Sequence, residues 1–277
     1  GSSGQLWQSG STFGLCMASL GLSALRSLLS RGSAGKGWQP PEASWSRSFG
    51  LGWQSPFTVR YASNLDDGPW HGMPLGGFGA GCIGRSSRGD FNLWHLDGGE
   101  HWYGSIPDCQ FALWEQQGDQ VRVHALATEP TRDDSRPESG TPLSSWQWYP
   151  ASTEETSTGT YAARYPLSWN HYAGVFRAEV SCEAFSPILP GDYQRSSYPV
   201  AVFRWTLSNP TNKPLELSLL LSWRNTVGWF TNTDSSAEVH FRDDGSPEHN
   251  YAPAIGAGEG QSNRWIDGDG LNGVLLD

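Results

Sequence analysis

The chain has 277 residues, a formal net charge of -10 and a pI of about 5.1. Its 18 Lys and Arg residues form no dense run, which excludes a nucleic-acid backbone or an anionic membrane surface as the main partner. Its length allows one large domain or two smaller ones with a real core, and its 15 Trp, 34 Gly and 18 Pro favour many short strands over long helices.

The first 50 residues differ in composition from the rest. Apolar residues such as Leu15, Leu22 and Leu29 recur at steps of three and four, which predicts a short amphipathic helix over about Thr12–Ser30. This stretch is too short and too interrupted for the roughly 20 residues of a spanning helix, and no basic residue precedes it as in a signal peptide. Ser30–Ser48 has a linker composition. We expect a leader helix and linker over 1–50 and the folded domain over 51–277.

A glycine-rich segment follows, and it contains the pattern GxGxxG at residues 79–84. In a dinucleotide site this pattern leaves a strand and opens a helix, whereas here the turn sequence Arg85-Ser-Ser-Arg-Gly-Asp90 comes next. We therefore expect no nucleotide site. The glycines are predicted to allow close backbone approach or positive φ between strands, and no cofactor is expected.

The segment from Phe91 to Gly104 holds the candidate ligand-binding side chains. Asp97 or Glu100 could act as a general acid beside Trp rings that stack on a sugar, and we take Asp97, Glu100, His101 and Trp102 as candidates for substrate contacts. The spacing of the histidines matches no metal-ligand pattern, so no metal is expected. Core packing is the favoured role of Trp94 and Trp102.

Two alternating runs after this cluster predict a hairpin. Gln110–Trp114 and Gln120–Leu126 flank a turn at residues 116–119. Glu129–Thr158 is polar and contains four prolines, which is typical of a long loop.

The segment from Val175 to Arg224 carries the strongest strand pattern. Alternate residues between 176 and 184 are apolar, as they are in Tyr198–Ser208 and again from Leu215 to Trp223. Turn-forming residues separate the three runs. We expect three adjacent strands of an antiparallel sheet with one face in the core, and hence an all-β fold. No clear strand is predicted from Thr231 onward except a short run at 273–276.

The cysteines and the sequons bear on the compartment. Cys16, Cys82, Cys109 and Cys182 form no CxxC pair, so buried thiols are favoured over disulfide bridges. No glycosylation acceptor with a permissive middle residue is present. A cytoplasmic location is favoured over secretion, while a peripheral membrane location stays open.

Several ordered motifs together resemble the N-terminal domain of glycoside hydrolase family 116, which includes non-lysosomal glucosylceramidases and bacterial β-glucosidases. The resemblance runs from about Ser55 to Asp277. The motifs are Gly72–Arg85, Arg88–Phe91, Asp108–Phe111, Tyr165-Pro166 with Trp169, Ser186–Pro190, Pro199–Trp205 and Ser222–Asn225.

The resemblance implies a large antiparallel β-sandwich packed against an (α/α)6 barrel of the same polypeptide. In the family a Glu nucleophile and an Asp acid/base in that barrel carry the retaining chemistry, and no position of this chain matches either motif. We therefore assign no catalytic role to Asp90, Asp97, Glu100 or Asp108. The chain, expected to be truncated at both ends and to lack the catalytic barrel, should be inactive alone.

The resemblance predicts that the chain braces the catalytic barrel of an enzyme that acts on β-glucosides or glucosylceramide, and that loops such as Asp97–Tyr103 shape the substrate pocket. The alternative is a free-standing carbohydrate-binding module. A module should present tryptophans in an open groove, whereas a bracing domain should present a broad apolar patch.

Overall fold

The computed structural model describes most of the segment that the strand patterns cover. The described residues are 15–16, 38–51, 72–96, 102–129, 147–227, 239–241, 247–249, 261–268 and 271–277. Every strand pair in them is antiparallel, and one short helix is present, so the fold class is all-β as predicted.

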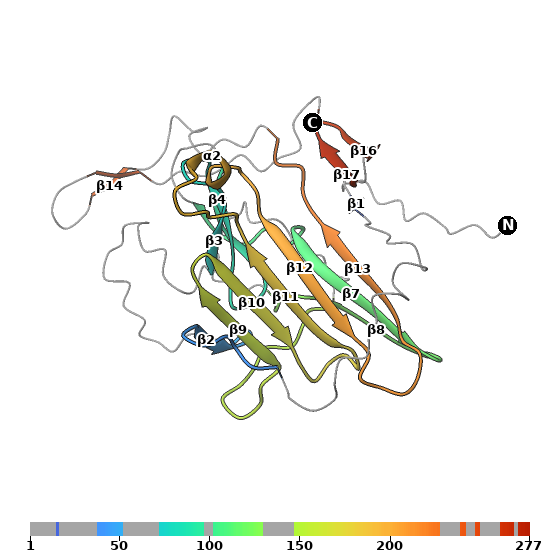
Figure 1. Cartoon of the computed structure of the whole chain (residues 1–277). Helices are drawn as coiled ribbons and strands as arrows, with labels where there is room; N and C mark the ends of the chain where they lie inside the picture. The colour runs from blue at the N-terminus through green and yellow to red at the C-terminus, as the bar shows by residue number, and fades with distance from the viewer. Residues whose placement is uncertain are drawn as a thin grey trace.

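Three sheets build the body of the domain (Figure 1). Sheet I has the order β12 (Val202–Ser208), β11 (Glu179–Phe185), β10 (Leu167–Tyr172), β9 (Gly159–Arg164) and β2 (Trp45–Ser48). Sheet II has the order β1 (Leu15–Cys16), β13 (Glu216–Ser222), β7 (Gln110–Gln117) and β8 (Gln120–Ala125). Sheet III has the order β3 (Met73–Leu75), β4 (Cys82–Arg85), β5 (Phe91–His95) and β6 (Trp102–Tyr103).

Smaller elements complete the described chain. Helix α2 (Tyr193–Ser196) connects β11 to β12, and two separate hairpins follow sheet II in sequence. These hairpins are β14 (Val239–Phe241) with β15 (Pro247–His249), and β16 (Asn263–Gly268) with β17 (Leu271–Leu276). The run expected at 273–276 is confirmed as part of β17. The expectation of no other strand after Thr231 is wrong, because short strands rich in polar residues give a weak alternation signal.

The hydrophobic core lies between sheets I and II. Phe111 of β7 packs across the sandwich against Phe203 and Trp205 of β12, with ring centroids 5.1 and 5.0 Å apart. Val180 and Cys182 of β11 are buried on the same inner face. The alternation predicted for this strand is confirmed, because its even-numbered residues 180–184 are the buried ones.

The third predicted strand, β13, does not lie beside β12. It pairs with β7 in sheet II, so the chain crosses the sandwich through the turn at residues 209–215. This placement lets the leucines of β13 at 217, 219 and 221 face the core from the side opposite β12. The alternation was correct about the buried face, but it contains no information about the neighbouring strand.

The predicted hairpin over 110–126 is confirmed as β7 and β8, which turn at Gly118 with a φ of +59°. Two described parts of the N-terminal 50 residues are strands. Leu15–Cys16 lies inside the predicted helix but pairs with β13, and the rest of Thr12–Ser30 lies outside the described residues. Trp45–Ser48 lies in the expected linker and pairs with β9. The domain boundary near residue 50 stays a prediction.

Candidate functional site

The glycine-rich segment folds as the turn between β3 and β4, and Gly76, Gly77 and Gly81 in this turn have no room for a side chain. A Cβ on Gly76 would lie 2.0 Å from the carbonyl oxygen of Gly81, and a Cβ on Gly81 would lie 2.3 Å from that of His95. Gly79 and Gly81 also have positive φ, at +72° and +81°. The predicted role of these glycines is confirmed, and a strand, not a helix, follows the pattern.

Hydrogen bonds hold this turn against the end of sheet I. The amide of Gly76 donates to Ser186 Oγ at 2.7 Å, and Ser186 Oγ donates to the carbonyl of Val200 at 2.8 Å. The amide of Phe78 donates to the carbonyl of Ser196 at 2.9 Å. The turn is therefore fixed to both ends of the α2 connection.

Further along, β3 is attached to sheet I by Tyr161. The amide of Met73 donates to the Tyr161 hydroxyl at 2.9 Å. Burial raises the pKa of Tyr161 to about 12, so its hydroxyl stays protonated at neutral pH. The strand that leads into the turn is therefore held in place against sheet I.

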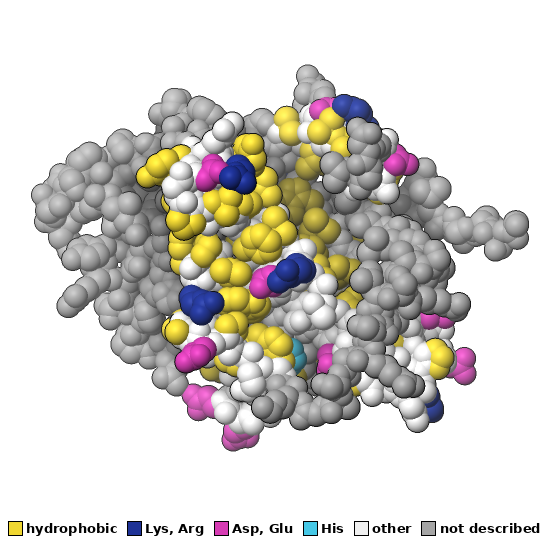
Figure 2. Space-filling view, in the orientation of Figure 1, with side chains coloured by type: hydrophobic (Ala, Val, Ile, Leu, Met, Phe, Trp, Pro, Cys, Tyr) yellow, Lys and Arg dark blue, Asp and Glu magenta, His cyan; other side chains and the backbone are white. Residues whose placement is uncertain are grey.

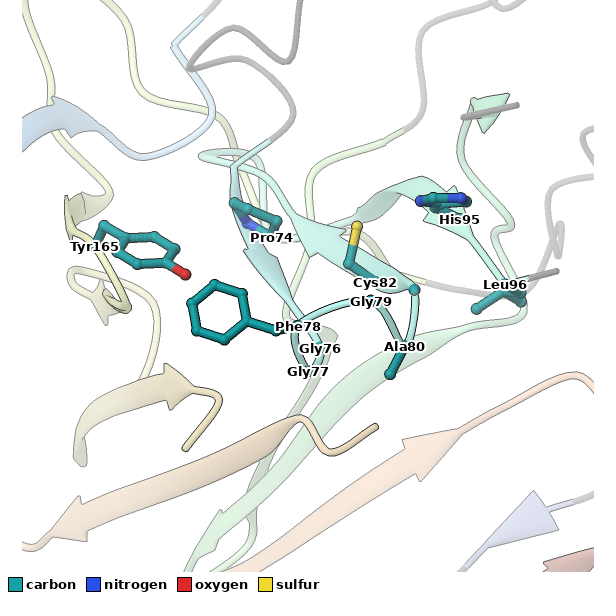
Figure 3. Close-up of a pocket in the computed structure, with 11 residues that line it drawn as sticks. Pro74, Gly76, Gly77, Phe78, Gly79, Ala80, Cys82, His95, Leu96 and Tyr165 are labelled. Carbon is teal, nitrogen blue, oxygen red and sulfur yellow. The ribbon is translucent and has the colours of Figure 1, made fainter. Parts of the chain in front are cut away.

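A hollow of about 570 Å³ opens beside this turn (Figure 3). It is lined by Pro74, the turn at 76–82, His95, Leu96 and Tyr165. Figure 3 shows the rings of Phe78 and Tyr165 next to each other on one side, with Cys82, His95 and Leu96 toward the other. The described lining contains no Asp, Glu, Lys or Arg, so it is a neutral, aromatic-lined site of ordinary ligand-pocket size.

The predicted substrate contacts border this hollow in sequence. Leu96 lines it and directly precedes Asp97, but Asp97, Glu100 and His101 lie outside the described residues. Trp102 belongs to β6 and pairs with Trp94, and its side chain is not described. Their role stays a prediction.

Sequence reasoning missed the lining residues Phe78, Cys82 and Tyr165. The glycine-rich segment was a sequence signal for the hollow, but it was interpreted only as a place where the backbone adopts positive φ or approaches another strand closely. Tyr165 arrives from the β9–β10 turn, so only the sheet topology brings it beside Phe78. Trp94, in contrast, has the packing role predicted for it: it is fully buried, and its indole Nε1 donates to the Gly104 carbonyl at 2.9 Å.

The buried acids Asp90 and Asp108 have structural partners. Asp90 accepts a short hydrogen bond from Ser86 within the turn between β4 and β5. Asp108 accepts from Arg224 Nε at 2.9 Å and from its Nη2 at 2.5 Å. Both carboxylates are thus used in holding loops, and in the described ranges no group of three His, Cys, Asp or Glu could hold a metal ion.

Arg85 is the charged residue that the sequence reasoning did not single out. It is fully buried and donates to Asn170 Oδ1 at 3.1 Å, to the Tyr172 hydroxyl at 2.6 Å and to the carbonyls of Gly89 and Leu126. Its guanidinium lies 5.1 Å from the ring centroid of Phe111. Neutral acceptors and ring faces therefore solvate this cation inside the core.

The described cysteines are not in disulfides, as predicted. Burial raises the pKa of Cys109 to about 12 and that of Cys182 to about 11, which keeps both thiols protonated. Cys82, at the hollow, is half-buried.

A comparison with protein families decides what kind of chain this is. Residues 72–277 match the sequence model described as beta-glucosidase 2, glycosyl-hydrolase family 116, N-terminal. The chain belongs to glycoside hydrolase family 116. The matched family 116 N-terminal domain begins at Gly72, directly before β3, and includes the hollow, Arg85 and all three sheets apart from β1 and β2.

The family 116 match confirms the resemblance drawn from the motifs, and it makes the chain part of a β-glucosidase or glucosylceramidase type of enzyme. Over its described residues, this family 116 domain has no helix long and apolar enough to cross a bilayer.

Proposed function

We propose that this family 116 domain is a scaffold that braces the helical catalytic domain of a retaining β-glucosidase or glucosylceramidase, and that its loops shape the mouth of the substrate pocket. The observation that carries the proposal is an exposed apolar surface on a domain of this family. The bond-breaking groups are assigned to the catalytic domain.

The apolar surface surrounds helix α2, and we call it the α2 patch. It consists of Leu189, Tyr193, Tyr198 and Val200, all exposed, with Tyr193 exposed over 79% of its surface. Figure 2 shows hydrophobic side chains gathered over α2 and the adjoining part of sheet I. Large contiguous apolar surfaces mark interaction sites in folded domains, and a bracing domain needs such a surface.

Charge supports the same assignment. An ion pair at α2 joins Arg195 to the N-cap residue Asp192 at 2.5 Å, so these two charges largely neutralise each other. A second pair, Arg204 with Glu183, lies on the outer face of sheet I. A partner with a neutral apolar face could cover this region without burying an unpaired charge.

The partners of the described acidic residues support the assignment of glycoside hydrolysis to the catalytic domain. Retaining hydrolysis needs two carboxyl groups about 5 Å apart, one as nucleophile and one as acid/base. The hollow has no carboxylate among its described lining residues, and the buried Asp90 and Asp108 are bonded to Ser86 and Arg224.

The rival function, a carbohydrate-binding module, has less support. The tryptophans with exposed side chains among the described residues are Trp45 at 40% and Trp265 at 52%. They belong to β2 of sheet I and to the separate β16–β17 hairpin, so they do not form a row on one sheet. The α2 patch favours the bracing role.

The first test is an activity assay. The purified chain is expected to show no hydrolysis of an aryl β-glucoside above the buffer rate. Robust turnover that disappears in Asp97→Asn or Glu100→Gln would overturn the proposal, because it would place the catalytic carboxylates in this chain. Folding of each sample is checked by near-UV circular dichroism.

A further inference from the structure

We propose that the hollow beside the glycine-rich turn binds the neutral, apolar aglycone of a β-glucoside, while the glucose unit lies toward the catalytic domain. This inference rests on the proposed function, since it adds to it a ligand class and a place. Three observations carry it: the chemistry of the lining, the rigidity of the walls and the free volume.

The lining chemistry selects an apolar group. Phe78 and Tyr165 supply two aromatic faces, and both side chains are exposed, at 50% and 58%. Pro74, Ala80 and Leu96 add aliphatic surface. Neutral aromatic and aliphatic walls of this kind favour hydrophobic ligand groups.

The same lining is a poor site for glucose. Polar side-chain atoms come from Cys82, His95 and Tyr165, whereas a pyranose presents several hydroxyl groups that each need a partner when buried. A buried hydroxyl group that lacks such a partner weakens binding. The sugar ring is therefore expected outside the hollow, and its hydrophobic substituent inside.

The walls are preorganised, so little conformational entropy is lost on binding. Gly77 has no room for a side chain, because its Cβ would lie 2.4 Å from the backbone of Ser197. The turn is also hydrogen-bonded to Ser186 and Ser196. Gly79 is the exception: no atom lies within 4 Å of the Cβ position, so its outer side faces open space.

The experiment measures how fast N-ethylmaleimide labels Cys82 in the full chain carrying Cys16→Ser. Cys109 and Cys182 are buried, so Cys82 is the reporter at the hollow. Octyl β-glucoside, below its micellar concentration, is expected to slow labelling roughly threefold at twice its dissociation constant. Glucose at the same concentration should leave the labelling rate unchanged.

Two variants and a second reporter make the test specific. Phe78→Ala should abolish the protection, and Tyr165→Phe, which keeps the ring, should retain it. A reporter thiol placed by Val123→Cys lies on exposed β8 of sheet II and should not be protected. Protection of both reporters alike would indicate general detergent binding and would overturn the inference.

Two other results would overturn it as well: equal protection by glucose, which would make the hollow a sugar site, and no protection by octyl β-glucoside. All measurements use the chain by itself and follow binding. These labelling results are therefore independent of the tests of the bracing proposal, which are the hydrolysis assay of the chain and the variants of the α2 patch.

Discussion

At the scale of single residues, Arg85 shows how this fold accommodates a cation in its core. The described residues place no carboxylate in an ion pair with it, and carbonyls, an amide oxygen, a hydroxyl and ring faces take that role. Arg85 reaches from β4 of sheet III to Asn170 and Tyr172 of β10 in sheet I, and so it links the two sheets.

Replacing Arg85 by Met should therefore lower the free energy of unfolding by about 3 kcal/mol, because several buried acceptors lose their donor at once. Urea unfolding followed by tryptophan fluorescence measures this change. Arg164→Met is the matched control: Arg164 is exposed on β9, and the change there should stay within about 0.5 kcal/mol. Equal effects at both positions would contradict the linking role of Arg85.

His171 predicts a pH dependence. Its ring stacks on Trp38 with centroids 5.0 Å apart. Burial lowers the pKa of His171 below its ordinary 6.5, and the smaller effect of the negative charge on Glu179 raises it. Below pH 6.5 the His171 imidazole is therefore protonated in the unfolded chain, whereas in the folded chain it is protonated only at lower pH. The free energy of unfolding consequently falls as the pH is lowered through this range.

The stability advantage of the wild type over His171→Gln should accordingly shrink between pH 7.5 and 5.5. Urea unfolding of both proteins at the two pH values tests this, and the comparison cancels the titration of other groups. An advantage that grows toward pH 5.5 would mean that the His171 pKa is raised.

At the scale of elements, the alternation of apolar residues predicted which face of β11, β12 and β13 is buried, but it did not predict that β13 crosses to sheet II. A period of two fixes orientation because adjacent side chains point to opposite faces. Which strand β13 pairs with depends on how the apolar faces of the two sheets pack together, and this is a property of the assembled core. Helix α2 has four residues, too few for any helical period to be visible.

The β3–β4 turn predicts unequal costs for two glycine substitutions. Gly79→Ala should cost about 1–2 kcal/mol, because positive φ is the sole penalty there. Gly81→Ala adds a clash with the His95 carbonyl and should cost about 3 kcal/mol or more. Thermal unfolding of the two variants compares them directly, and equal melting temperatures would contradict the close approach of the turn to β5.

At the scale of the whole molecule, sequence reasoning succeeded with fold class and family and failed with the hollow. The family motifs and strand alternation are local properties of the chain. The hollow instead depends on Phe78, Leu96 and Tyr165, which meet only when sheets I and III are packed together. The candidates Asp97, Glu100 and His101 follow Leu96 in sequence but lie outside the described residues, so their contact with substrate stays a prediction.

The bracing role predicts that the α2 patch matters only when the catalytic domain is present. In a polypeptide that contains both domains, Tyr193→Ser with Tyr198→Ser should lower the unfolding free energy of the catalytic domain by about 3 kcal/mol, since two aromatic side chains lose their buried partner surface. In the isolated chain both tyrosines are exposed, so the same double change should alter stability by less than about 0.5 kcal/mol.

The matched control changes Val121 and Val123 to Ser, on the exposed edge strand β8, and it should leave both proteins unaffected. Differential scanning calorimetry separates the transitions of the two domains, and β-glucosidase activity after heating reports on the catalytic domain. If the tyrosine variants destabilised the isolated chain as much as the joined protein, the patch would belong to this domain's own core. If neither protein changed, the surface facing the catalytic domain would have to lie elsewhere on the sandwich, and the proposed place of contact would be wrong.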